Sequence, residues 1–99
     1  MRSEKLIKTK LRSSNWKCSD EMENDVEYYE LRFTSDRDVE GWIKKFGVLN
    51  PECVFRAVLV WNQNLVVVQK DEESFIAIPI GDQMIASIDD DLMVFKKVA

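Results

Sequence analysis

Three consecutive carboxylates, Asp89, Asp90 and Asp91, form a run of possible metal ligands in this sequence. Carboxylate oxygens bind hard cations such as Ca²⁺, which would make the cluster a fragment of a metal-binding loop. Calcium loops, however, place their ligands at alternate positions around a glycine and end in a glutamate, and neither feature follows here. We therefore interpret the run as a solvent-exposed turn, and we predict no metal site and no cofactor.

The groups that usually perform nucleophilic catalysis are scarce. The 99 residues include two cysteines, Cys18 and Cys53, and no histidine. Because a thiol or hydroxyl nucleophile needs a general base, and histidine is the commonest one, covalent catalysis lacks its usual partner here. The three glycines are too far apart to form a phosphate-binding loop. We therefore predict a protein that is not an enzyme, with Cys53 buried in an apolar run and Cys18 exposed.

Charge is distributed unevenly along the chain, and an acidic segment covers residues 20–30. A local negative surface can engage a basic surface on another protein, and tyrosine is common at the centre of such interfaces. The segment therefore predicts a site for a protein partner. Its proposed contact residues are Glu21, Glu23, Asp25, Glu27 and Tyr28. The alternative is a solvated loop that pairs with the basic N-terminal residues in the folded chain.

The basic residues that precede this segment indicate a second class of function, nucleic-acid binding. Lysine and arginine side chains could neutralise phosphates while a tryptophan stacks on a base. The residues that would make this contact lie within residues 2–17 and are Lys5, Lys8, Lys10, Arg12, Trp16 and Lys17. The other interpretation is an edge strand whose lysines prevent aggregation, with Trp16 covering part of the core. The net charge of −4 favours that interpretation, so nucleic acid is the less favoured partner.

Two segments of the first third of the chain predict strands. Residues 5–12 alternate imperfectly between apolar and polar side chains, which favours a strand and leaves a helix as the alternative. Residues 26–34 alternate cleanly, with Tyr29, Leu31 and Phe33 on one face. We expect that face to cover the core.

Residues 35–46 carry the clearest helical pattern. Ser35 and Asp38 have the spacing of a capping pair at the first turn of a helix. The apolar residues that follow the spacing of one helical face are Val39, Trp42, Ile43 and Phe46. Gly47 is a typical residue at which a helix ends. The pattern therefore predicts one amphipathic helix packed across a sheet.

The second half of the chain is rich in strand patterns separated by short polar turns. The predicted strands cover residues 53–61, 65–69, 75–80 and 92–98, whereas residues 84–88 fit a helical turn or a short strand. Residues 53–61 are apolar at almost every position, which is typical of a central strand covered on both faces. Short polar turns favour antiparallel pairing of these strands.

Together these patterns predict a single domain, residues 1–99, of the α+β class. We expect five or six mostly antiparallel strands with the one main helix, residues 35–46, on one face. We expect a small protein-binding domain of the inhibitor, immunity or accessory-subunit type, which acts through protein–protein contact. A sheet edge offers a second route to a partner, by strand addition or by formation of a homodimer. No run reaches the roughly 18 apolar residues that cross a bilayer, so we expect no membrane partner and a location in the cytoplasm or, as the alternative, the nucleus.

Overall fold

The structure is a computed structural model, and it describes residues 11–19, 25–62, 65–70, 73–88 and 91–98. Most of the strand predicted over residues 5–12 lies outside the described residues, as do Asp89 and Asp90 of the carboxylate cluster.

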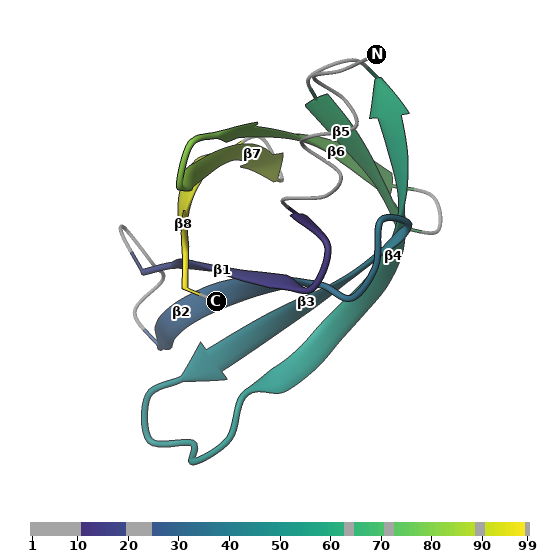
Figure 1. The fold of residues 1–99 in the computed structure, drawn as a ribbon. Coiled ribbons are helices and arrows are strands. Elements are labelled where there is room, and N and C mark those ends of the chain that lie inside the picture. Colours follow the sequence, from purple (N-terminus) through teal and green to yellow (C-terminus); the bar gives the residue numbers. More distant parts are fainter. Residues whose placement is uncertain (1–10, 20–24, 63–64, 71–72, 89–90, 99) are drawn as a thin grey trace.

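The described residues form eight β-strands, which hydrogen bonds between neighbours close into one antiparallel barrel (Figure 1). In chain order the strands are β1 Ser14–Cys18, β2 Val26–Phe33, β3 Asp38–Lys45, β4 Glu52–Asn62, β5 Leu65–Lys70, β6 Glu73–Ile80, β7 Gln83–Ile88 and β8 Asp91–Lys97. Each strand pairs with the next one along the chain, and β8 returns to pair with β1. The predicted α+β fold, an open sheet of five or six strands with one main helix, is therefore wrong.

The barrel closes along a short seam between β1 and β8. Trp16 pairs with Lys97 and Lys17 with Lys96, and the N–H of Val98 donates to the carbonyl of Asn15 at 2.8 Å. The predicted second route to a partner, through a sheet edge by strand addition or homodimer formation, would need a free edge. The closed order gives every strand a neighbour on both sides. Over the described residues, however, the first half of β4 pairs with β3, whereas the pairing of β4 with β5 begins only at Val58.

The helix predicted over residues 35–46 is instead a tight turn followed by β3. Ser35 does cap backbone groups, because its hydroxyl accepts hydrogen bonds from the N–H groups of Arg37 and Asp38 at 3.0 and 3.1 Å. These bonds close the turn between β2 and β3, an arrangement that a serine supports as readily as a helix start. β3 then pairs with β2 on one side and β4 on the other. Pairing on both sides outweighs the helical spacing of its apolar residues.

The residues of the predicted helical stripe are divided between the two faces of β3. Val39 is buried in the core, whereas Trp42 lies on the outer face beside Arg32. Phe46 falls just beyond the end of the strand and is exposed. This division follows from the two-residue period of a strand, which places side chains three apart on opposite faces.

The remaining strand predictions agree with the structure. β2 confirms the strand predicted over residues 26–34, with Leu31 and Phe33 buried and Tyr29 packed against the core. β4 and β5 confirm the predicted hairpin, and β6 and β8 confirm the two strands expected later in the chain. Residues 84–88, which fitted either a helical turn or a strand, belong to β7.

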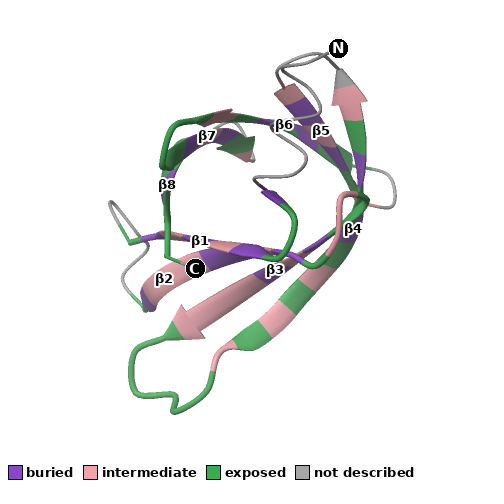
Figure 2. Cartoon of the chain, in the orientation of Figure 1, coloured by how far each residue is buried: buried purple, intermediate pink, exposed green. Residues whose placement is uncertain are grey.

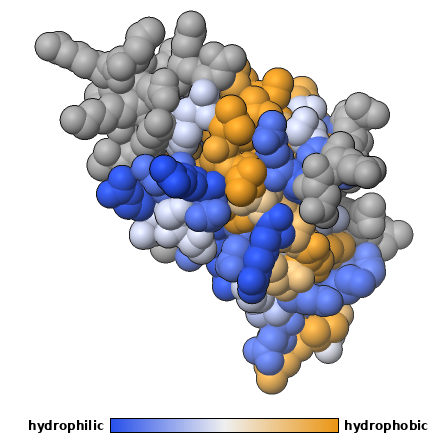
Figure 3. Space-filling view, turned by 90° about the vertical axis from the view of Figure 1, so that its right-hand side faces the viewer, coloured by the Kyte–Doolittle hydropathy of each residue, from blue (hydrophilic) through white to orange (hydrophobic). Residues whose placement is uncertain are grey.

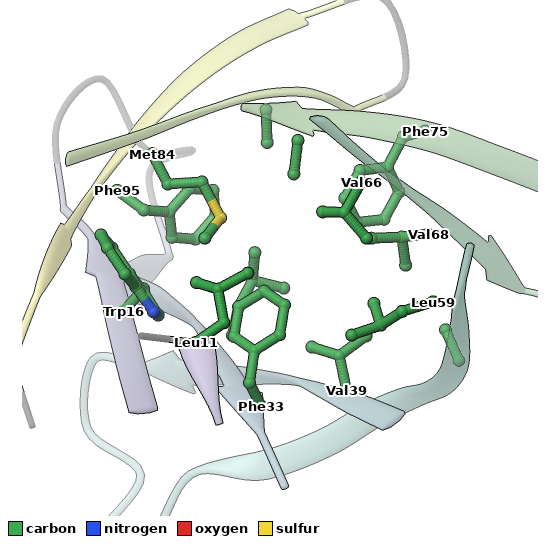
Figure 4. Close-up of a cluster of buried hydrophobic side chains, with 14 of the residues drawn as sticks. Leu11, Trp16, Phe33, Val39, Leu59, Val66, Val68, Phe75, Met84 and Phe95 are labelled. Atoms are coloured by element: carbon green, nitrogen blue, oxygen red, sulfur yellow. The ribbon is translucent and has the colours of Figure 1, made fainter. Parts of the chain in front are cut away.

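All eight strands contribute apolar side chains to the inside of the barrel (Figure 4). Its largest fully buried members include Trp16, Phe33 and Phe95. The indole N–H of Trp16 donates to the hydroxyl of Ser14 at 2.8 Å, and that hydroxyl in turn donates to the carbonyl of Leu11. Because a buried indole N–H is costly without a partner, this pair allows a tryptophan to fill the barrel.

Three burial predictions are wrong, those for the strand over residues 53–61, for Cys18 and for Cys53. The strand expected to be covered on both faces, β4, has Ala57 and Leu59 in the core, but Val58 and Val60 are 50% and 44% exposed. Figure 2 shows exposed residues alternating along this strand. Cys18, expected to be exposed, is buried at an inward position of β1, and Cys53 is only half-buried. A closed barrel has a single interior, so the burial of a residue depends on which face of its strand it occupies.

Candidate protein-interaction site

The connection between β3 and β4, residues 46–51, projects from the lower end of the barrel in Figure 1. The N–H of Phe46 donates to the carbonyl of Asp25 at 3.1 Å, which joins this connection to the start of β2. The N–H of Val48 donates to the carbonyl of Lys45 at 3.3 Å, and Gly47 between them has φ +80°. That left-handed backbone suits glycine, so the chain turns sharply there. The connection is therefore a hydrogen-bonded turn attached to two strands.

Three apolar side chains of this turn face solvent, and we call Phe46, Val48 and Leu49 the hairpin tip. Their exposed fractions are 62%, 49% and 89%. Figure 3 shows hydrophobic surface at the lowest end of the molecule, where Figure 1 places this connection. Single exposed apolar residues are common on soluble proteins, but three on one projecting turn form an apolar patch that a partner can cover.

Charged side chains surround the base of the hairpin tip and are paired with one another. The ammonium of Lys44 lies 3.0 Å from the carboxylate of Glu27 and also donates to the carbonyl of Lys45 at 3.0 Å. The ammonium of Lys45 lies 3.8 Å from the carboxylate of Asp25. These two lysines and two carboxylates thus give the base equal numbers of positive and negative groups. An apolar centre with a polar border is the usual anatomy of a protein–protein interface.

The outer face of β1, β2 and β3 continues from this border as a packed aromatic and charged surface. The ammonium of Lys17 lies 4.3 Å from the ring centroid of Tyr28, and the guanidinium of Arg32 lies 4.0 Å from the ring of Trp42. Arg32 also donates from Nε to the carboxylate of Glu30 at 3.0 Å, and Glu30 is buried although it lies on the outer face. Cation–π contacts and a shielded ion pair restrict the rotamers of these side chains. This face therefore presents a preformed surface.

Three of the five acidic-segment residues can be placed. Asp25, Glu27 and Tyr28 lie next to the hairpin tip, whereas Glu21 and Glu23 lie outside the described residues. The structure brings Lys44 and Lys45 of β3 against the two described carboxylates. Each of the two described carboxylates of the acidic segment is therefore paired with a lysine of β3.

The structure describes three of the nucleic-acid candidates, Arg12, Trp16 and Lys17, and it does not offer all three to solvent. Trp16 is fully buried, so its ring faces are taken up by the core rather than offered to a base. Arg12 lies 3.5 Å from the carboxylate of Asp36, and Lys17 lies over Tyr28. The other three candidates, Lys5, Lys8 and Lys10, lie outside the described residues. Stacking by Trp16, on which the nucleic-acid interpretation depended, finds no support in this arrangement.

Among the described residues, no three histidine, cysteine, aspartate or glutamate side chains are grouped closely enough to hold a metal ion. A surface depression of about 510 Å³ lies over β5, β6 and β7, with Lys70, Glu73 and Ser87 among its polar lining residues. The ammonium of Lys70 lies 3.6 Å from the carboxylate of Glu73 and 4.6 Å from the ring centroid of Phe55. Because this cation is already engaged within the chain, we assign no ligand to the depression.

Comparison of the chain with protein-family models, with curated proteins and with solved structures found no match. The described residues contain no helix long and apolar enough to pass through a lipid bilayer.

The hairpin tip was missed by the sequence reasoning. The helical interpretation assigned Phe46 to an apolar stripe facing the core and gave Val48 and Leu49 no role. A signal was present, because Gly47 and Pro51 delimit a turn that contains large apolar residues. Turn residues are normally polar, so apolar side chains in a turn are candidates for contact with a partner.

Proposed function

We propose that this chain is a small, non-enzymatic protein-binding domain of the inhibitor, immunity or accessory-subunit type. It acts by inserting the hairpin tip into an apolar pocket of another protein. The observation that supports this proposal most directly is the 89% exposure of Leu49 on a turn held by backbone hydrogen bonds. A side chain this exposed adds nothing to the core, and a turn already in its bound shape loses little conformational entropy on binding.

The size of the hairpin tip indicates how much of the affinity it can supply. Burying a Val, Leu or Phe side chain stabilises a complex by about 1.5–3 kcal/mol, so three partly exposed ones contribute on the order of 4–6 kcal/mol. Micromolar binding needs about 8 kcal/mol after the cost of association. The tip therefore serves as an anchor, and the charged border must supply the remainder together with specificity.

The acidic-segment residues take a different role in this proposal from the one expected of them. Asp25 and Glu27 form part of the polar border, each paired with a lysine of β3. A partner with complementary charges could exchange these pairs for intermolecular ones, which fixes its orientation more than its affinity. Tyr28 extends the contact toward the outer face of β2. We assign the interaction to the cytoplasm, where a chain with two cysteines rather than a disulfide framework is typical.

The test is a quantitative capture experiment from host lysate with nuclease present, read by mass spectrometry. The bait proteins are the wild type, Leu49→Asp at the hairpin tip, and Val98→Asp as a control at another exposed apolar position, 52% exposed. We expect a stoichiometric protein partner with the wild type and with Val98→Asp, reduced at least about 30-fold with Leu49→Asp. Equal capture by all three baits would refute insertion of the tip. Recovery of nucleic acid, with proteins lost on nuclease treatment, would instead support the basic N-terminal residues.

A further inference from the structure

The first half of β4 has a paired strand on one side only. Toward β3, the pairing covers β4 from Glu52 to Val58. Toward β5, the pairing begins at Val58, and β5 itself ends at Lys70. Figure 1 shows the lower half of β4 beside β3, with β5 joining it only higher up. Within the described part of the chain, residues 52–56 therefore form an open sheet edge, which we call the β4 edge.

The β4 edge directs backbone hydrogen-bonding groups away from β3. The N–H of Leu59 donates to the carbonyl of Arg37 at 2.8 Å, so Leu59 directs its backbone groups toward the β3 side. Successive residues of an antiparallel ladder direct these groups to opposite sides, so those of Arg56, like those of Val58, point away from β3. Val54, where the register with β3 shifts, has no partner residue in β3. The edge thus presents donors and acceptors that a further strand can pair with.

We propose that the β4 edge of a second copy of this chain pairs with it, antiparallel and about a two-fold axis at Val54, so that the two barrels share a continuous sheet. A two-fold axis places the same segment on both sides of an interface, so the segment must be complementary to itself. Glu52 and Arg56 lie two residues before and two residues after Val54, and all three side chains are exposed. The pairing therefore places Glu52 of each copy opposite Arg56 of the other. Opposite charges at facing positions stabilise neighbouring strands, whereas like charges destabilise them.

The side chains that this pairing brings together are free to meet. Within the described residues, no cation lies at ion-pair distance from Glu52. Arg56 pairs with Glu40 through Nε at 3.6 Å, yet its side chain remains 79% exposed, so its terminal nitrogens can reach a carboxylate of the second copy. Val54 is 52% exposed and would meet its own counterpart on the axis. Because Glu52 and Arg56 cancel in charge, the edge opposes self-association less than the acidic remainder of the surface does.

The length of the β4 edge limits the strength and fixes the register of the dimer. Pro51 has no backbone N–H to extend the ladder at one end, and β5 occupies β4 from Val58 at the other. Five paired residues make a small interface, for which we expect a dissociation constant on the order of 100 µM. A slip of two residues would place Glu52 opposite Val54 and lose both ion pairs, so the charges select one register.

The experiment is sedimentation velocity on the full chain from about 10 to 1000 µM, a range that brackets the expected dissociation constant. The chain mass is 11.6 kDa, and we expect the wild type to shift toward twice that mass within the range. Val54→Lys places two like charges opposite each other on the axis and should raise the dissociation constant at least about 10-fold. Val60→Lys is the matched control and should leave the dimer intact. It makes the same change on the same strand, at a residue that is 44% exposed, where β5 already occupies the edge.

An exchange of charges tests the register and also serves if Val54→Lys loses its far-ultraviolet circular dichroism. Glu52→Arg and Arg56→Glu each oppose like charges at both ends of the paired segment, and each should raise the dissociation constant about 10-fold. The double variant restores opposite charges and should return the constant to within about 3-fold of the wild type. Within one chain the two side chains lie four residues apart along a strand, about 13 Å, so contact between copies is what restores the affinity.

Three results would overturn the dimer through the β4 edge. One is a wild type that stays at 11.6 kDa over the whole range, even if that monomer binds an extended segment of another protein at the edge. Another is a folded Val54→Lys variant that dimerises as well as the wild type. The third is a double charge-exchange variant that is as weak as either single one. Capture of a partner through the hairpin tip can succeed or fail independently, because it depends on Leu49 and on none of the residues changed here.

Discussion

Replacing Gly41 with alanine tests how closely β3 and β4 are packed inside the barrel. A Cβ atom at Gly41 would overlap the ring of Phe55, the residue directly opposite it on β4. Phe55 packs against the core and forms an edge-to-face pair with Phe75, with ring centroids 6.1 Å apart and an interplanar angle of 84°. The ammonium of Lys70 lies 4.6 Å from the same ring. The added methyl group must therefore displace a ring that makes two specific contacts.

The magnitude follows from three contributions to the free energy of unfolding. Forcing an extra methyl group into a packed site costs about 1–3 kcal/mol. Loss of the aromatic pair with Phe75 costs about 0.5–1.5 kcal/mol, and alanine gains about 0.5–1 kcal/mol over glycine in a strand. We therefore expect Gly41→Ala to lower the free energy of unfolding by about 0.5–4 kcal/mol. Backbone propensity alone predicts the opposite sign, so the direction of the change is informative.

Urea denaturation followed by circular dichroism measures this difference, and a double-mutant cycle assigns its cause. In a Phe55→Leu background the ring is gone, so Gly41→Ala should become neutral or slightly stabilising. The same loss in both backgrounds would refute the steric explanation. A neutral or stabilising effect of Gly41→Ala in the wild-type background would refute the close approach of the two strands.

Three further changes test the packing described above. Ser14→Ala removes the hydroxyl that accepts the indole N–H of Trp16, and leaving that buried donor unpaired should lower the free energy of unfolding by about 1–3 kcal/mol in a urea titration. Glu30→Ala leaves Arg32 beside an aromatic ring without its carboxylate partner, and we expect it to lower the free energy of unfolding by about 1–2 kcal/mol. Glu30→Gln should restore part of that loss. Phe95→Ala opens a cavity in the barrel and should lower the free energy of unfolding by about 3–5 kcal/mol in the same titration.

Much of the strand content was accessible from the sequence because alternation is a local property. In β2, apolar residues at every second position predicted both the strand and the face that enters the core. The β4–β5 hairpin followed from apolar runs on either side of an asparagine-rich turn. These patterns involve residues only a few positions apart, so they can be recognised from the sequence alone.

The helix prediction failed because the local sequence signals of residues 35–46 fit either a helix or a tight turn followed by a strand. Their apolar residues fit a helical face, and Ser35 fits a helix cap, but a serine caps a tight turn equally well. What distinguishes the alternatives is a partner strand on each side, and β4 begins beyond the hairpin tip. The same missing information placed Phe46 in the core instead of at the hairpin tip.

The sequence by itself determined that the chain is rich in antiparallel strands, has no histidine and lacks the common catalytic and phosphate-binding motifs. Composition and local period are sufficient for those statements. Only the tertiary structure decided that β8 returns to β1, and therefore that one face of every strand is interior and the other exterior. That closure buries Trp16 and Cys18, brings Asp25 and Glu27 against lysines of β3, and leaves the hairpin tip in solvent. Its physical origin is the pairing of strands distant in sequence, which no local pattern encodes.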